Sequence, residues 1–334
     1  MTVRASLLVF LTSAAYAAPP CTAAKPECTE WVVFGAGPQR SLIYRTHSLD
    51  VQDAAVVRAL VVVHGMNRDA DNYFKDAAAA AFLAGALEDT AVIAPRIASN
   101  AGGSCRDALA PNEMSWPCGL WRSGGAAEGN PGITSFDFVD EILRKLASKK
   151  AFPNLKEIVV TGHSAGGQYA GRYAMSNTVH DEVAKLGVPV SYVVSNPSSY
   201  AYLDATRPNA DGSAFGPYND AANCTTYNRW PYGLLDRVGY TAKIPDAQLK
   251  QQLASRPVTY LLGELDTLPL AGFDSSCPAM AQGPSRLARG QAWAKYVSQK
   301  IGAHHQVVLV PMCGHNARCM YTSDAALPVL FPKP

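Results

Sequence analysis

Ser164 follows a hydrophobic run and lies within a glycine-rich turn, a setting that suits a nucleophile. Residues 158–171 read IVVTGHSAGGQYAG. A strand, a sharp turn and a helix in this order form a nucleophile elbow, which exposes the serine of G-x-S-x-G on a strained turn. The glycines are needed because side chains at Gly162 and Gly166 would clash where strand and helix approach. The segment predicts a nucleophilic serine, the alternative being a serine in an ordinary strand-to-helix turn.

A serine hydroxyl needs a general base, and the base needs an acid that orients it. His315 follows the last predicted strand within C-G-H-N, and Asp266 follows the preceding strand within G-E-L-D. Glu264 and Asp274 are alternative acids. We favour Asp266 because the acid usually follows its strand by a few loop residues. The sequence thus predicts a triad of Ser164, Asp266 and His315.

Acyl transfer through a serine also needs backbone amides that bind the negative charge on the carbonyl oxygen. These are commonly the amide after the nucleophile and one after the third strand. They would be Ala165 and Met66, with Asn67 of the same H-G-M-N segment as the competing assignment. His64 and His163 are expected to hold turns by hydrogen bonds.

The elements that must carry these residues alternate between buried strands and helices, which is typical of a parallel α/β sheet. Two short strands near the start are expected to form an antiparallel edge. The predicted strands are Trp31–Phe34, Leu42–Tyr44, Ala59–Val63, Ala91–Pro95, Ile158–Thr161, Pro189–Val194, Val258–Leu262 and His305–Val310. The predicted helices are Ala70–Leu87, Thr134–Ser148 and Ser285–Ile301.

On these motifs the chain resembles secreted α/β-hydrolases, and within them the serine esterases and depolymerases that include polyhydroxybutyrate depolymerases and feruloyl or acetyl xylan esterases. The resemblance covers about residues 59–315 and rests on G-H-S-A-G-G, G-E-L-D and C-G-H-N in this order. It implies an α/β-hydrolase fold, with a mostly parallel central sheet flanked by helices, and an enzyme that cleaves carboxylic esters through an acyl-enzyme.

Two long stretches break the alternation, and such stretches in a compact domain are usually functional. They are Ser99–Gly132 and Tyr200–Arg256. The second is predicted as an aromatic-rich insertion after the sixth strand, acting as a lid or a cleft wall. Its aromatic side chains would form either a substrate platform or small satellite cores. The candidate cleft residues of the two stretches are Trp116, Trp121, Tyr200 and Trp230.

Residues 1–17 have the features of a secretory signal peptide. Arg4 supplies the positive charge, an apolar region follows, and Ala15, Tyr16 and Ala17 form a small-x-small cleavage site. We expect cleavage after Ala17, which leaves residues 18–334 as one catalytic domain of a secreted or periplasmic protein. No later apolar run is long enough to span a bilayer.

All eight cysteines follow the predicted signal peptide, and an even number in an exported chain favours disulfides. Spacing leaves the connectivity open; local pairing would give Cys21–Cys28, Cys105–Cys118 and Cys313–Cys319, with Cys224 left for Cys277. Zinc is the rival use, but no C-x-x-C or paired Cys and His spacing supports it. We expect neither a metal nor another cofactor.

The formal net charge of +2 gives no support for binding to nucleic acid or a membrane through bulk charge. The first function we expect is hydrolysis of small or polymeric esters. The second is cleavage of amides, peptides or a polyamide such as poly(aspartic acid), for which Arg96, Arg106, Arg122 and Arg229 lie in or beside the irregular stretches. The third is a non-catalytic binding protein, since fold does not imply function. The oligomeric state stays open.

Overall fold

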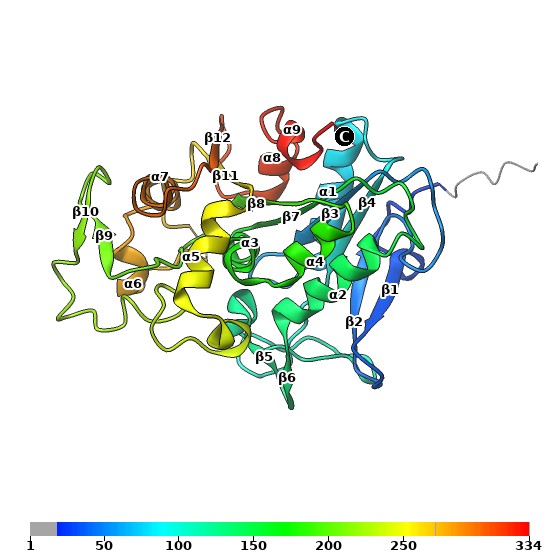
Figure 1. Cartoon of the computed structure of the whole chain (residues 1–334), viewed down its shortest axis with the longest axis horizontal. Helices are drawn as coiled ribbons and strands as arrows, with labels where there is room; N and C mark the ends of the chain where they lie inside the picture. Colours follow the sequence, from blue (N-terminus) through cyan, green and yellow to red (C-terminus); the bar gives the residue numbers. More distant parts are fainter. Residues whose placement is uncertain (1–18, 271, 334) are drawn as a thin grey trace, which may run out of the picture.

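The computed structural model describes residues 19–270 and 272–333 and contains one eight-stranded sheet (Figure 1). The predicted signal peptide lies outside these residues. The strand order is β1-β2-β4-β3-β7-β8-β11-β12. Neighbours from β4 to β12 pair in parallel, whereas β2 pairs antiparallel with both β1 and β4. The strands are β1 (Thr29–Val33), β2 (Arg40–Arg45), β3 (Arg58–Val63), β4 (Thr90–Pro95), β7 (Glu157–His163), β8 (Val190–Ser195), β11 (Val258–Gly263) and β12 (Gln306–Val310). The predicted mostly parallel sheet with an antiparallel edge is therefore confirmed.

Helices cover both faces of this sheet, so its central strands are apolar on both sides. Along β3, Leu60 and Val62 belong to one core, and Val61 and Val63 belong to the other. The first core is closed by α1 (Ala70–Leu83), α8 (Ala317–Tyr321) and α9 (Leu327–Leu330). The second is closed mainly by α2 (Ser135–Ala147), α3 (Ala165–Ser176), α4 (Val179–Lys185), α5 (Asp246–Ser255) and α7 (Arg286–Tyr296).

Local sequence signals explain where several of these helices begin and end. Helix α2 starts with a capping box, in which the Thr134 hydroxyl and the Asp137 carboxylate each accept the backbone N–H of the other residue. Helix α1 ends at Leu83, before the predicted Leu87, because the chain turns at Gly85 with a φ of 66°. Helix α7 is continued by a π-helical turn, Val297–Ile301, which completes the predicted helix.

The predicted insertion contains more regular structure than its sequence suggests. It holds the hairpin of β9 (Thr206–Pro208) and β10 (Phe215–Pro217), a 3₁₀ turn (Gly239–Lys243) and α5. Figure 1 places that hairpin at the opposite end of the molecule from β1 and β2. Smaller elements elsewhere are the 3₁₀ turns Pro26–Cys28 and Leu120–Ser123, the hairpin of β5 (Ala126–Ala127) and β6 (Asn130–Thr134), and the short helix α6 (Cys277–Met280).

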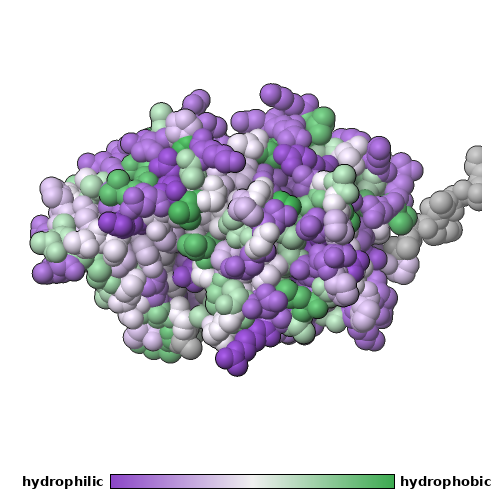
Figure 2. Space-filling model, turned by 90° about the horizontal axis from the view of Figure 1, so that it is seen from below, coloured by the Kyte–Doolittle hydropathy of each residue, from purple (hydrophilic) through white to green (hydrophobic). Residues whose placement is uncertain are grey.

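No helix within residues 19–270 and 272–333 has the length and hydrophobicity needed to cross a bilayer. On the face seen in Figure 2, hydrophobic side chains form separate patches among hydrophilic ones.

Four disulfides link the chain in the predicted pairs. They join Cys21 to Cys28, Cys105 to Cys118, Cys224 to Cys277, and Cys313 to Cys319. The third ties the insertion to the segment before α7, and the fourth brackets the residue predicted as the catalytic base. The cysteine prediction is confirmed, and the disulfides fit an oxidising compartment.

The start of α3 lies in direct backbone contact with three strand ends. A Cβ atom added to Gly166 would lie 2.1 Å from the carbonyl oxygen of Val63 in β3. A Cβ on Gly162 would meet the backbone of Gly166 at 2.3 Å, and one on Gly167 would meet the Ser195 oxygen at 2.3 Å. These glycines therefore set how closely the helix approaches the sheet.

We predict that Gly166→Ala destabilises the protein by about 3 kcal/mol, because the methyl group can be accommodated only by moving backbone. Gly171→Ala on the same helix is the matched control, since its Cβ would lie 3.6 Å from Val194, an ordinary contact. That change should be neutral or stabilise by about 0.5–1 kcal/mol. Urea unfolding of both variants measures the difference, and equal stabilities would contradict the role given to the contact.

Candidate active site

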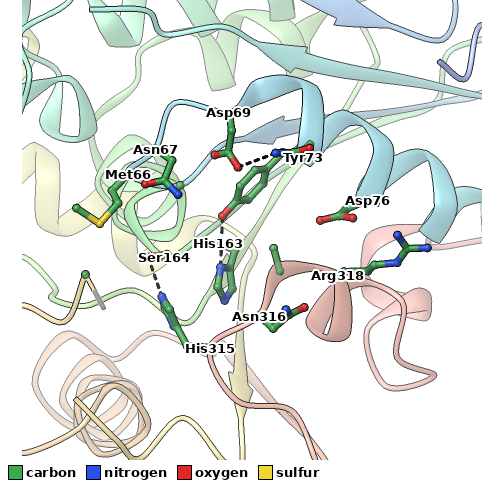
Figure 3. A pocket seen from close by; sticks show the side chains of 14 residues that line it. Met66, Asn67, Asp69, Tyr73, Asp76, His163, Ser164, His315, Asn316 and Arg318 are labelled. Carbon is green, nitrogen blue, oxygen red and sulfur yellow. Dashed lines mark hydrogen bonds between the residues drawn. The ribbon is translucent and has the colours of Figure 1, made fainter. Parts of the chain in front are cut away.

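The three residues predicted as a triad lie within hydrogen-bond distance of one another. His315 Nε2 is 2.9 Å from Ser164 Oγ, and His315 Nδ1 is 2.7 Å from Asp266 Oδ2. Figure 3 shows the histidine directed at the serine. Because the carboxylate can only accept, Nδ1 carries the proton and Nε2 is free to accept from the serine hydroxyl. This arrangement can deprotonate the serine during attack on a carbonyl carbon.

Asp266, and neither of the two alternative acids, faces the histidine. Its side chain is buried, whereas Glu264 is exposed. Asp274 instead accepts a hydrogen bond of 2.7 Å from the Tyr232 hydroxyl. The structure thus brings together the residues that the sequence favoured.

The loops that carry Asp266 and His315 are joined by a buried amide side chain. Asn196, at the end of β8, accepts a hydrogen bond of 2.8 Å from the Gly263 N–H. Its amide nitrogen donates to the Gly314 carbonyl at 3.2 Å. One side chain therefore fixes the ends of β11 and β12 relative to each other, and with them the acid and the histidine.

Ser164 has the backbone conformation of a nucleophile elbow. Its φ of 61° and ψ of −119° lie in a region that residues with a side chain rarely adopt. Helix α3 begins at the next residue, Ala165, and the first N–H groups of a helix have no partner within it. The Ala165 amide is thus available at the position predicted for one oxyanion donor.

The second predicted donor lies in a turn between β3 and α1. The Arg68 N–H donates to the Gly65 carbonyl at 3.2 Å, and this bond does not use the amides of the two central residues, Met66 and Asn67. Both residues line the pocket beside Ser164. The Arg68 side chain anchors the turn by an ion pair of 2.7 Å with Asp107. Either amide can serve, and the choice between them stays open.

The other two histidines near the site are neutral. Burial lowers the pKa of His64 to about 4; its Nδ1 donates to the Gly65 carbonyl at 2.9 Å, and its Nε2 accepts the Ile97 N–H at 3.1 Å. Burial also holds the pKa of His163 well below its usual value, and its ring lies 4.6 Å from that of His315. As predicted, His64 holds the turn by hydrogen bonds.

A pocket of about 330 Å³ opens beside Ser164. One wall is a face of α1, and the opposite wall is the start of α8 (Figure 3). Most of its side chains are polar, and two carboxylates accompany one guanidinium. The lining residues include Met66, Asn67, Asp69, Asn72, Tyr73, Asp76, His163, Ser164, His315, Asn316 and Arg318. The site is therefore wide enough for a small substrate group and has a polar wall.

Comparison with known proteins agrees with this geometry. A protein-family model described as the alpha/beta hydrolase family matches residues 60–328. The chain belongs to the alpha/beta hydrolase family. Membership confirms the fold and supports hydrolase activity.

Solved structures with the same fold include two polymer-degrading enzymes. One is LpqC, a poly(3-hydroxybutyrate) depolymerase from Bordetella parapertussis, with 20% identity, coverage of 88% of this chain and 84% of that chain, and a TM-score of 0.57. The other is poly(aspartic acid) hydrolase-1 from Sphingomonas sp. KT-1, with 23% identity, coverage of 87% and 94%, and a TM-score of 0.60. No curated protein sequence is significantly similar to this chain.

The four aromatic residues expected in the cleft of this α/β-hydrolase lie elsewhere. Trp116, Trp121, Tyr200 and Trp230 are buried in the core on the face of the sheet that α2, α3 and α7 cover, and none lines the pocket. Trp116 stacks on Phe138 at 6.1 Å, for example. Large rings bury more apolar area in a core than on a cleft wall, and these four belong to the main core, so they form neither a substrate platform nor a separate satellite core.

The predicted boundaries of the cleft were also wrong, and its actual walls were missed. No residue of the two irregular stretches lines the pocket. Instead, it is lined by Asp69, which directly precedes α1, and by Asn72, Tyr73 and Asp76 of α1. Their spacing places them on one helical face directly after the oxyanion segment. That spacing indicates a shared helical face, but it is the same for a solvent-exposed face and for a cavity wall.

We predict that Asp266→Asn lowers the rate of Ser164 labelling by a fluorophosphonate about 10⁴-fold, because the amide would stabilise the wrong histidine tautomer. Asp274→Asn is the control, since that residue does not contact His315, and its labelling rate should stay near wild type. The rates can be measured by intact mass against time. A loss of reactivity in the Asp274 variant instead would reassign the acid.

Proposed function

We propose that the protein is an exported serine hydrolase that cleaves carboxylic esters. Ser164 attacks the carbonyl carbon while His315 takes its proton, and Asp266 orients the imidazole. The amides of Ala165 and of Met66 or Asn67 stabilise the oxyanion, and His315 then returns the proton to the departing alcohol. Water hydrolyses the acyl-enzyme by the same steps. The observation that carries the proposal is the 2.9 Å contact between His315 Nε2 and Ser164 Oγ at the pocket.

Exposed apolar side chains at Met66 and on nearby loops support an ester with an apolar or extended part. Met66, Leu265, Leu268, Leu270 and Met312 are all exposed. The loop that carries Leu265, Leu268 and Leu270 reaches the Met66 side chain at Gly272. At the start of this loop, the Leu265 N–H donates to the Cys313 carbonyl at 2.9 Å. Met66 lines the pocket, and the other four residues lie on the chain segments next to Asp266, Gly272 and His315. A polyester chain or a fatty acyl group that extends from the pocket over these segments would contact them.

The alternative is a polyamide hydrolase with the same triad, and the similarity to poly(aspartic acid) hydrolase-1 favours it. The charges near the serine disfavour it. Arg96, Arg106, Arg122 and Arg229 do not line the pocket. Arg96 pairs with Glu113, and Arg229 pairs with Asp236 at 3.0 Å. Among the residues that line the pocket, a polyanion would meet the carboxylates of Asp69 and Asp76, with the Arg318 guanidinium as the single countercharge.

Export is supported by the signal-like residues 1–17 and by the four disulfides. A depolymerase would need export, because a polymer too large to import must be cut outside the cytoplasm. The intact mass of protein purified from the periplasm or the medium reports the cleavage site, and we expect Ala18 as the first residue.

We predict that a fluorophosphonate adds one adduct to the wild-type protein and none to Ser164→Ala. A panel of p-nitrophenyl esters and the matched anilides should then give higher kcat/KM for the esters, because an alcohol leaves more readily than an amine. Faster anilide turnover would favour the amidase. A folded wild-type protein with no adduct would favour a non-catalytic binding protein.

We also predict that the pocket discriminates by charge. A choline ester should have about two- to five-fold higher kcat/KM than its uncharged 3,3-dimethylbutyl isostere, since exposed charge pairs contribute up to about 1 kcal/mol. Asp76→Asn should reduce the ratio of the two kcat/KM values, and high salt should reduce it as well. If an anionic ester had a kcat/KM equal to that of the choline ester, the result would contradict this prediction and support the polyanion alternative.

A further inference from the structure

Arg286 is a buried arginine on the opposite side of the Asp266 carboxylate from His315. Its side chain has an exposed fraction of 0%, and that of Asp266 is 1%. Arg286 Nη1 lies 3.5 Å from Asp266 Oδ1, whereas His315 Nδ1 contacts Oδ2 of the same carboxylate. The two oxygens of the acid thus have different partners, one cationic and one the imidazole.

Arg286 is itself held firmly. Its Nε donates to Ser198 Oγ at 2.8 Å, and its guanidinium lies 5.2 Å from the centre of the Phe273 ring. It is the first residue of α7, which Ser285 caps. The next residue, Leu287, donates its N–H to the Asp266 carbonyl at 3.1 Å. The start of α7 therefore contacts both the backbone and the side chain of the acid.

We propose that Arg286 is a positioning residue of the triad, an inference that rests on the proposed function. It fixes the rotation of the Asp266 carboxylate so that Oδ2 faces His315, and it compensates a negative charge that would otherwise be buried beside a neutral imidazole. Ion pairs couple strongly where water is excluded, and removal of one partner leaves the other charge uncompensated. Arg286 does not touch the serine or the pocket, so its effect on catalysis passes through the aspartate.

Arg289, one turn along α7, provides a matched comparison. It also has an exposed fraction of 0% and lies against the same Phe273 ring, at 4.4 Å. Its guanidinium, however, donates to backbone carbonyls, among them Ser198 at 2.5 Å and Asp274 at 3.0 Å. Loss of either arginine removes a buried cation and packing, but only loss of Arg286 removes the partner of the triad acid.

The test compares R286M, R286K and R289M by kcat, KM, labelling rate and urea unfolding. We expect R286M to lower kcat about 10- to 100-fold with KM nearly unchanged, since small misplacements of catalytic groups cost this much. R286K, which keeps the charge, should regain part of the loss. R289M should lose stability but keep kcat within about two-fold of wild type. An R286M variant with wild-type kcat, or an equal kcat loss in R289M, would overturn the proposal.

A double-mutant cycle with D266N separates positioning from general stability. If Arg286 acts through the acid, R286M should add no further loss of labelling rate in the D266N background. Fully additive losses would show a structural role and overturn the proposal. R286K replaces R286M in the cycle if the methionine variant does not fold. A wild-type protein that neither labels at Ser164 nor cleaves esters would refute the proposed function instead, so the two failures are distinguishable.

Discussion

Backbone contact between the start of α3 and the ends of β3, β7 and β8 fixes where chemistry can occur in this protein. No side chain separates helix from sheet there, because Gly162, Gly166 and Gly167 would each place a Cβ within 2.3 Å of another backbone atom. The contact holds Ser164 at a positive φ and aims the first free amide of α3 at the same point. The proposed nucleophile and the proposed oxyanion donor are thus positioned by one close approach of helix and sheet.

The acid and the histidine need a different kind of restraint, because they lie on loops that have no such contact with a helix. Their positions depend on cross-links between neighbouring strand ends. The Asn196 side chain bridges Gly263 and Gly314, and the Cys313–Cys319 disulfide encloses His315 within a short loop. The start of α7 adds the contact between Arg286 and Asp266. Arg286 and Asp266 are therefore a buried charged pair between these loops, and this pair supports the histidine from the side away from the pocket.

The sequence was sufficient for the parts of the site that depend on backbone geometry. Three sequence signals each reflect a local requirement of the backbone or of burial. They are the glycine spacing around Ser164, the apolar runs of strands buried on both faces, and the order of Asp266 and His315 after their strands. The short spacings between cysteines indicated disulfide pairs because pairing between residues close in sequence is also a local requirement. The pocket walls were missed because a polar residue on a helix, such as Asn72, gives the same pattern whether it faces solvent or a cavity. Arg286 was missed because only the tertiary fold buries it beside an acid. The tryptophans were wrongly predicted to line the cleft, because aromatic residues in irregular stretches occur both in cores and on cleft walls.

The polar wall and the oxyanion turn form one continuous unit, which affects how substrate binding can contribute to catalysis. Asp69 directly precedes α1. The hydroxyl oxygen of Tyr73 in that helix lies only 2.6 Å from the position that a Cβ atom on Gly65 would take. Movement of α1 would therefore displace the turn that carries Met66 and Asn67. A substrate group bound along α1 would meet a wall already in register with the oxyanion donors. Binding energy from that remote group can then be used at the reacting carbonyl, provided that the contacts tighten in the transition state.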